Sequence, residues 1–452
     1  MSVVGKYAEF AVSCRTKDHS EDLLHHAKRA LIDWFGCTLP GGLEEPAVLM
    51  TKALDEDIGR GKSTLLPQGE RATTRTAALI NGTASHIIEF DDIYRDGLFH
   101  PGAPIISAAL AVAEMTNSSG VDLLRAVIAG YEVANSIAEA VNPHHYEWWH
   151  TTATVGFFGA SASAAVLLGL NSERTGHALA TAGTMAAGLQ QAFRADAMSK
   201  PIHSGRAAEG GVLSALLAKN GVTGAFDILE GERGFGNAMS ANVDWTKSVD
   251  MLENNHSITK ITQKNHAACG HVHAIIDALN HIRNTNEINP TKIKKIKIGS
   301  YQKTYEICHN PNPKTPYEAK FSSEYCAAMA IIKGRALRSD DFLKENLQDS
   351  SVKNLMNIVD LKIDKGCQNV FPKARSANVE VVTLDGEVFA HFAATRKGDP
   401  DNPLSDSELS SKYTDLVEPV AGKPVGEALL SALWSAEKLK SIKDLDLENL
   451  RR

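Results

Sequence analysis

Two adjacent carboxylates and two histidines stand in an apolar part of the chain. Residues 86–92 read HIIEFDD and residues 99–102 read FHPG, which places Asp91 and Asp92 among apolar residues shortly before His100. Two carboxylates are costly to bury unless they have partners. These residues are therefore candidates for proton transfer or ligand binding, although Asp92 could instead only cap a helix.

A further histidine precedes a long uncharged stretch. His150 follows two tryptophans in the segment WWHTT, and residues 151–172 carry no charged side chain. An imidazole at the mouth of buried helices is a candidate acid or base, because its pKa lies near neutrality. The alternative is a histidine that merely caps or fills. We predict that residues 151–172 form buried helix and not a membrane span, because they are rich in Thr, Ser, Ala and Gly and lack flanking Lys/Arg asymmetry.

Three basic side chains gather in the segment MSKPIHSGRAA at 198–208. Lys200, His203 and Arg206 lie at a predicted junction of a loop with a helix, before small residues. Helix N-termini attract anions, and small residues let a ligand approach the backbone closely. The segment therefore predicts a carboxylate site, with an ordinary solvated turn as the alternative.

The segment 264–273 reads KNHAACGHVH. Its Cys269, His271 and His273 are zinc ligands by residue type, but they lack the usual helical spacing, and no C-x-x-C or H-E-x-x-H motif accompanies them. We predict no metal, and expect acid–base or anion-binding chemistry, because this segment lies at the proposed domain junction, where ligands commonly bind. Nucleotide, dinucleotide and serine-hydrolase functions lack support, since no Walker, complete G-x-G-x-x-G or G-x-S-x-G motif is found.

Helices are expected to position the first three segments. Apolar residues recur with helical spacing at 23–34 and 123–134, and Gly and Pro separate helical stretches up to about residue 270. The pattern then changes to strands, in KIKKIKIG at 292–299 and in two runs that Asp385 and Gly386 join, which is a hairpin signal.

Helical segments are predicted again near 325–334 and 339–347. From residue 404 the helical pattern returns, with Ser405 and Glu408 spaced as a capping box, so this tail could rejoin the first domain. We predict a mainly α fold with an α+β second domain, in which residues 1–270 and 404–452 form the helical domain and residues 271–403 form the α+β domain.

Bulk properties exclude several classes of protein. The chain of 452 residues is long enough for two or three domains, and its 43% hydrophobic and 22% charged residues are typical of a folded protein. Six scattered cysteines and no signal-peptide pattern indicate reduced thiols, so we expect a cytoplasmic protein. The formal charge of −7 argues against nucleic-acid binding, and it requires that cations be gathered locally for an anionic substrate.

The four segments, in this order and over this length, resemble those of the MmgE/PrpD family, which includes 2-methylcitrate dehydratase, cis-aconitate decarboxylase and an iminodisuccinate epimerase. The most specific parts are EFDD at 89–92 with His100 and Pro101, the pair Trp149 and His150, and KPIHSGRAA at 200–208. Weaker support comes from AKFSSEY at 319–325 and NPL at 402–404. The resemblance covers nearly the whole chain.

The resemblance implies a homodimer without metal or organic cofactor, in which a helical domain built from both chain ends carries an inserted α+β domain. Carried over by motif, the implied active-site residues are Asp92, His100, His150, Lys200, His203, Lys264 and Tyr325, with Asp91 as a weaker addition. Two departures stand out. Thr151 replaces a frequent proline, and QKNHAAC at 263–269 replaces a stretch that resembles Lys-Pro-Tyr-Pro, which weakens the transfer of a role to Lys264 and suggests a substrate other than methylcitrate.

We therefore expect a cofactor-independent lyase, first of all a hydro-lyase, that removes a proton beside a carboxylate of a small di- or tricarboxylic acid. An isomerase or epimerase, a decarboxylase, and a catalytically silent binding homologue are the alternatives. His150 or Asp92 is the expected base and His100 or Tyr325 the expected proton donor, with Lys200 also catalytic. The expected substrate-binding residues are Asp91, His203, Arg206, Lys264, His266 and His271.

Overall fold

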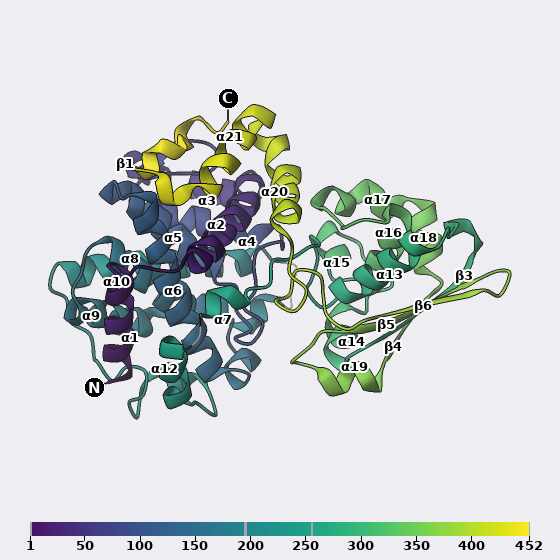
Figure 1. Cartoon of the computed structure of the whole chain (residues 1–452), viewed down its shortest axis with the longest axis horizontal. Helices are drawn as coiled ribbons and strands as arrows, with labels where there is room; N and C mark the ends of the chain where they lie inside the picture. Colours follow the sequence, from purple (N-terminus) through teal and green to yellow (C-terminus); the bar gives the residue numbers. More distant parts are fainter. Residues whose placement is uncertain (1, 194–196, 255, 452) are drawn as a thin grey trace. The chain divides into compact units, whose positions relative to one another are not determined.

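The chain folds into two compact units, seen in a computed structural model that describes residues 2–193, 197–254 and 256–451 (Figure 1). One unit combines residues 1–262 with residues 405–452, and the other is formed by residues 263–404. The first is built mainly from helices and the second carries a four-stranded sheet. The predicted fold class, mainly α with an inserted α+β part, is confirmed.

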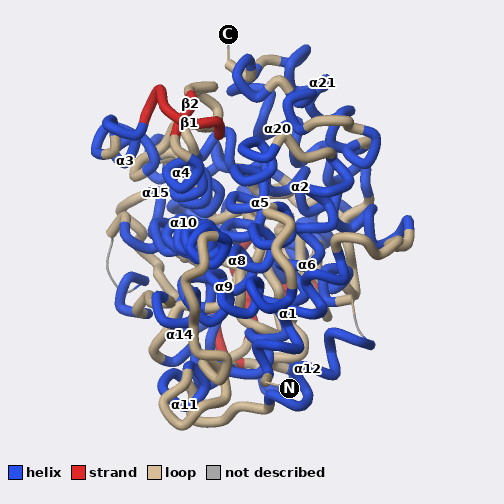
Figure 2. The backbone as a smooth tube through the Cα atoms, turned by 90° about the vertical axis from the view of Figure 1, so that its left-hand side faces the viewer, coloured by secondary structure: helices blue, strands red, loops and turns tan. Residues whose placement is uncertain are grey.

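The helical unit packs its helices around a large apolar core (Figure 2). A pair of short antiparallel strands, β1 (Ile58–Thr64) and β2 (Arg71–Ala72), is the sheet described in this unit. The helices are, in chain order, α1 (Val3–Cys14), α2 (Glu21–Gly41), α3 (Ala47–Ala53), α4 (Thr74–Ile87), α5 (Gly102–Thr116), α6 (Gly120–Val141), α7 (Thr151–Thr154), α8 (Gly156–Leu167), α9 (Ser172–Met185), α10 (Ser199–Lys219), α11 (Phe235–Met239), α12 (Trp245–Asn254), α20 (Asp406–Ala421) and α21 (Lys423–Trp434).

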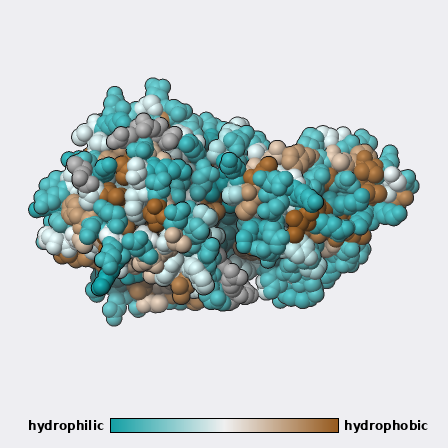
Figure 3. All heavy atoms as spheres, turned by 90° about the horizontal axis from the view of Figure 1, so that it is seen from below, coloured by the Kyte–Doolittle hydropathy of each residue, from teal (hydrophilic) through white to brown (hydrophobic). Residues whose placement is uncertain are grey.

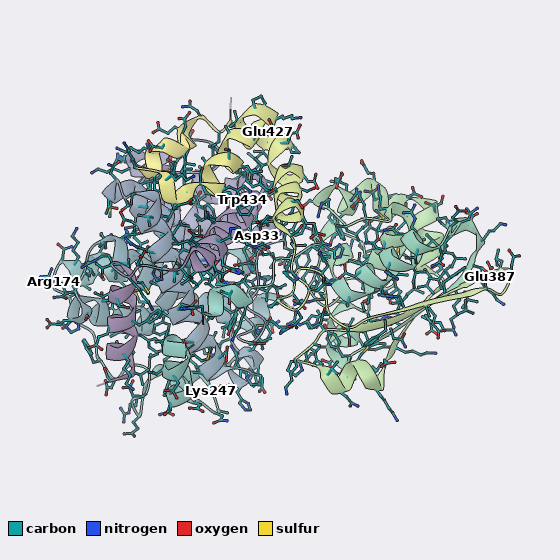
Figure 4. The ribbon with its side chains drawn as sticks, viewed as in Figure 1. Asp33, Arg174, Lys247, Glu387, Glu427 and Trp434 are labelled. Carbon is teal, nitrogen blue, oxygen red and sulfur yellow. The ribbon has the colours of Figure 1, made fainter. Side chains whose placement is uncertain are left out.

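The N-terminal and C-terminal segments of the chain pack together inside the helical unit, where α20 lies against α2 (Figure 1). Ser405 and Glu408 form the predicted capping box that starts α20, which confirms this motif. Lys412 of α20 donates to Asp33 of α2 over 2.6 Å and to the carbonyl oxygen of Phe90 over 2.8 Å. Both charged side chains are almost fully buried (Asp33 is labelled in Figure 4), so this ion pair ties the C-terminal segment to the N-terminal helices.

The uncharged stretch after His150 forms α7 and the whole of α8, and every residue from Thr151 to Val166 is buried. The prediction of buried helix is confirmed. No helix within the described ranges combines the length and the apolar character needed to cross a bilayer. Polar residues cover most of the face shown in Figure 3, with apolar residues exposed in small separate groups.

The α+β unit is organised around a sheet with strand order β4-β3-β5-β6. Strand β3 pairs in parallel with β4 and antiparallel with β5, and the predicted hairpin of β5 and β6 is confirmed, with Gly386 at a positive φ of 89° in its turn and Glu387 at its tip (Figure 4). The strands are β3 (Ile293–Ser300), β4 (Val359–Ile363), β5 (Ala377–Thr383) and β6 (Val388–Ala393), and the helices are α13 (His273–Thr285), α14 (Gln302–Cys308), α15 (Pro316–Lys320), α16 (Ser323–Lys333), α17 (Lys344–Gln348), α18 (Ser350–Met356) and α19 (Lys365–Val370).

Residues 263–270 belong to the α+β unit, whereas we grouped them with the helical domain from the sequence. Their backbone explains the difference. The Gln263 amide donates to the Gly398 carbonyl, the Ala267 amide to that of Leu337, and the Cys269 amide to that of Lys320. A loop without helical or strand periodicity does not indicate which unit its backbone will form hydrogen bonds with. From the sequence pattern, the domain boundary was therefore placed later, at the next predicted helix.

We predict that Lys412→Met destabilises the protein by about 3–5 kcal/mol, because it leaves the buried Asp33 carboxylate without its cation. Urea unfolding followed by circular dichroism measures the effect. The matched control is Lys423→Met, whose exposed pair with Glu427 at 3.8 Å contributes less than about 1 kcal/mol. Equal losses in the two variants would show that the buried pair does not hold the C-terminal segment in place.

Candidate active site

Helices α4 and α10, which carry site residues at facing ends, approach each other very closely. A Cβ atom added at Gly82 of α4 would lie 2.9 Å from the Cα of Gly205 of α10, so glycine at these positions lets the two backbones touch. His86 lies in the last turn of α4 and Lys200 in the first turn of α10. The close helix packing therefore brings these two polar ends together inside the unit.

Asp91 is a buried carboxylate between two imidazoles. The Nδ1–H of His86 donates to Asp91 Oδ2 over 2.7 Å, and His100 Nδ1 lies 3.1 Å from the same oxygen, at ion-pair distance but out of hydrogen-bond alignment. Burial alone would raise the pKa of Asp91, but the neighbouring His86 and His100 hold it well below its usual range. Burial lowers the pKa of His86 to about 3. Asp91 is thus charged and His86 neutral, with its proton on Nδ1.

His150 and His203 extend this group of imidazoles. The His150 ring stacks on that of His86 at a centroid distance of 5.7 Å and an interplanar angle of 25°. The Nδ1 atoms of His150 and His203 lie 3.1 Å apart, so one of them must carry a proton and the other a lone pair. Burial, with His86 and His203 next, holds the pKa of His150 well below its usual range, and burial lowers that of His203 to about 4. Both rings are neutral near pH 7.

Asp92 lies beside Asp91 in the chain but in a different environment. Its Oδ1 accepts a hydrogen bond from the Gly102 amide over 2.9 Å, and its Oδ2 accepts one from the Tyr131 hydroxyl over 2.7 Å. A Cβ at position 102 would lie 2.9 Å from both Asp92 Oδ1 and the Tyr131 hydroxyl, so only glycine leaves room here. Burial, then the charge of Asp33, raises the pKa of Asp92 to about 8. Asp92 therefore carries a proton at neutral pH.

Lys200 is buried and forms an ion pair with Glu89. Glu89 has a φ of 59°, in the left-handed region that costs energy for any residue with a Cβ. Such strain persists where the surroundings impose it, which is common at functional sites. Arg206 differs from these residues, because its side chain is about half exposed and pairs with Glu209 one turn further along α10.

The predicted site residues of the α+β unit are buried or partly buried and hydrogen-bonded there. His266 Nε2 contacts Asp277 Oδ1 at 2.8 Å, and its Nδ1 accepts from the Leu337 amide over 3.1 Å. His271 Nδ1 lies 2.9 Å from the Tyr301 hydroxyl, the Tyr325 hydroxyl donates to the Asp341 carbonyl over 2.6 Å, and Lys264 is almost fully buried. Burial raises the pKa of Tyr325 above its usual range.

The histidine and carboxylate group also has the composition of a metal site. One ligand atom each from His86, Asp91 and His100 lie within 4.8 Å of one another, and two imidazoles with a carboxylate form a set that divalent transition metals bind. Asp91 Oδ2 contacts both rings directly, so a bound ion would have to replace these contacts. The metal-free chemistry expected from the sequence stays a prediction.

Comparison with known families places this chain. The family model described as the MmgE/PrpD N-terminal domain matches residues 5–248, and that of the MmgE/PrpD C-terminal domain matches residues 266–435. The chain belongs to the MmgE/PrpD family. The resemblance noted in its sequence is thereby confirmed.

Several curated relatives match over nearly their whole length. A cis-aconitate decarboxylase-like protein of Aspergillus oryzae is 24% identical over 98% of this chain and 96% of its own. The cis-aconitate decarboxylases of Homo sapiens and Mus musculus are 26% and 25% identical, over 93% and 98% of this chain and 89% and 92% of their own. Their names associate lyase chemistry on a tricarboxylate with this MmgE/PrpD fold.

Two residues that contact the predicted site in this MmgE/PrpD protein were not predicted from the sequence. His86 and Glu89 both lie in the segment 86–92, which was singled out as a whole, but neither was named as a catalytic or substrate-binding residue. The chain leaves helical geometry just after Ile87, which turns Asp91 back toward His86 although five positions separate them. A histidine in the last helical turn before a pair of carboxylates was the available signal.

We predict that Asp92→Asn changes how stability depends on pH. The pKa of Asp92 rises from 3.8 to about 8 on folding, so between about pH 4 and pH 8 the native protein holds a proton that the unfolded chain releases. Its contribution to stability is complete below pH 3.8 and is lost as pH rises, with a slope of at most about 1.4 kcal/mol per pH unit. The variant lacks this slope.

Urea unfolding of both proteins over this pH range measures the difference. The free energy of unfolding of the wild type relative to Asp92→Asn should decrease as pH rises, whereas relative to Asp18→Asn, which removes an exposed carboxyl, it should stay nearly constant. A difference from Asp92→Asn that grows with pH would mean that Asp92 is charged in the folded protein.

Proposed function

We propose that this protein is a cofactor-independent lyase that moves a proton at the carbon beside a carboxylate of a small di- or tricarboxylic acid. The observation that carries the proposal is the group of four buried or partly buried imidazoles near Asp91, with Lys200 paired to Glu89 beside it. Proton abstraction at such a carbon needs a neutral base inside a site that also supplies positive charge and proton donors.

His150 is the proposed base. Its ring is buried and neutral near pH 7, and the tautomer with the proton on Nδ1, donated to His203, places the basic lone pair on Nε2. Asp92 was the other candidate, but both of its oxygens accept hydrogen bonds and its carboxyl is protonated at this pH. A protonated carboxyl cannot accept the substrate proton. We therefore propose a structural role for Asp92, which holds the start of α5 through its hydrogen bond from the Gly102 amide.

His100 is the proposed proton donor. It contacts the charged Asp91 at 3.1 Å, and it is the less buried of the two rings on that carboxylate. The Tyr325 hydroxyl, the alternative donor, is bonded to a backbone carbonyl in the α+β unit. Lys200 would stabilise the negative charge that develops on the substrate carboxylate when the proton leaves.

Three outcomes share this first step. Removal of the proton leaves an electron pair on the carbon and its carboxylate; loss of hydroxide from the next carbon, with a proton from His100, then completes a dehydration. Return of the proton to the opposite face would give epimerisation. In a decarboxylation a carbon–carbon bond breaks instead, carbon dioxide leaves, and the carbon takes a proton. Dehydration is the outcome expected from the sequence, and decarboxylation is a second candidate because the relatives are named for it.

Proton NMR in deuterium oxide tests the proposal with citrate, methylcitrate, cis-aconitate, malate and substituted succinates. We expect deuterium to enter the carbon beside a carboxylate, and the same spectra distinguish an alkene from a decarboxylated product. His150→Ala and Lys200→Ala should each slow this exchange roughly a hundredfold or more, the usual scale for a positioned acid or base.

The matched controls are His144→Ala and Lys219→Ala, which remove side chains at the surface and should leave the rate unchanged. A chelator should also have no effect if no metal takes part. Wild-type exchange that persists in His150→Ala would remove this residue from the proton transfer, and the absence of exchange with every compound would favour the binding homologue.

A further inference from the structure

Arg375 is a buried cation for which the described part of the chain provides no ion pair. It stands two residues before β5 and is only 7% exposed. Its Nε is buried without a hydrogen-bond partner, and within the described ranges no carboxylate lies at ion-pair distance from its guanidinium. A buried charge that lacks a counter-ion is strongly unfavourable, and Arg is the side chain that cannot escape the cost by losing its proton.

Asp399, a carboxylate whose charge attracts Arg375, is hydrogen-bonded to another arginine. Arg396, fully buried, donates to Asp399 from Nε over 3.0 Å and from Nη2 over 2.5 Å, and its Nη1 donates to the Gly270 carbonyl over 3.1 Å. Asp399 balances the charge of Arg396, so this part of the α+β unit retains the charge of Arg375. Burial, then the repulsion from Arg396, lowers the pKa of Arg375.

The neighbours of Arg375 are neutral groups able to bond or cover a ligand. Tyr301 stacks on Phe371 with ring centroids 4.4 Å apart, and its hydroxyl lies 2.9 Å from His271 Nδ1. Burial and the charges of Arg375 and Arg396 hold the pKa of His271 well below its usual range, so its ring is neutral. The charge of Arg375 thus lies near a hydroxyl, a neutral imidazole and an aromatic pair.

We propose that Arg375 binds a carboxylate group of a small-molecule ligand, with Tyr301 and His271 beside it. A guanidinium presents two parallel N–H groups that match a carboxylate, and one net positive charge balances one carboxylate better than a doubly charged phosphate. The inference extends the proposed function by assigning a carboxylate-binding residue, and it is tested by binding, so it can fail or succeed whether or not turnover is found.

The two sources of such a carboxylate are the unreactive end of the substrate and a separate carboxylate ligand. The test uses the full chain and isothermal titration calorimetry with tricarballylate and succinate, which lack the hydroxyl group and the double bond that could react. We expect Arg375→Met to weaken the binding of tricarballylate about 10- to 100-fold, the scale of a hydrogen-bonded charge. Arg233→Met, which removes an exposed arginine, should leave the affinity unchanged.

Thermal unfolding separates binding from a structural role. Without ligand, Arg375→Met should melt at the same temperature as the wild type or higher, because an apolar side chain replaces an unbalanced buried charge. If this variant fails to fold, Arg375→Lys is used to test the binding role instead. Lysine keeps the positive charge but lacks the two parallel N–H donors of the guanidinium. Arg375→Lys should bind tricarballylate several-fold more weakly than the wild type.

The kinetics identify the source of the carboxylate. If it belongs to the substrate, tricarballylate competes with the substrate and Arg375→Met loses kcat/KM by the same factor as affinity. If it belongs to a separate ligand, tricarballylate binding is lost while kcat/KM is kept. The proposal is overturned if the wild type binds neither compound, or if Arg375→Met, or Arg375→Lys where the first variant does not fold, binds them as tightly as the wild type.

Discussion

The arrangement of the candidate site in the helical unit depends on how the buried negative charge of Asp91 is stabilised. A carboxylate removed from water is stable only where donors and positive charge replace its hydration. Here His86 donates directly to Asp91 and His100 lies against the same oxygen. By contacting both imidazoles, Asp91 links the end of α4 to the segment before α5. His150 stacks on His86, and His203 lies at hydrogen-bond distance from His150.

Three buried aspartates are stabilised in three different ways, and these differences determine the protonation state and role of each. Asp33 pairs with Lys412 and ties the C-terminal segment to α2. Asp91 shares two histidines and stays charged. Asp92, near both, accepts two hydrogen bonds and keeps its proton. Burial first, and then the charges of Asp33 and Asp91, raise the pKa of Asp92, because both oppose its ionisation.

Much of this arrangement follows from local patterns in the sequence. The buried helices after His150, the hairpin at Gly386 and the capping box at Ser405 each depend on a few neighbouring residues, and each was predicted. The polar segments that carry the histidines were also found, because charges among apolar residues are visible without a structure. Pairings between distant positions were not, since nothing near Asp33 in the chain indicates Lys412 as its partner.

The same limit applies to charges that lack partners. Arg375 lies in a loop of ordinary polar composition, and only its burial shows that its charge is unbalanced. Glu89 likewise gave no sequence signal for its left-handed backbone, which has a φ of 59°. Local sequence thus predicted which residue types gather, whereas the protonation states depend on burial and on neighbours distant in the chain.

Burial holds the His150 ring neutral near the charged Asp91, so that His150 can act as a base near pH 7. Long-range proton–nitrogen correlation NMR of the isotope-labelled protein, with His150→Ala to assign the signal, reports the protonation and tautomer of this ring directly. We predict that His150 stays neutral when the pH is lowered through 6.5, the ordinary value for histidine. A His150 ring that takes up a proton near that pH would show that its surroundings do not hold it neutral.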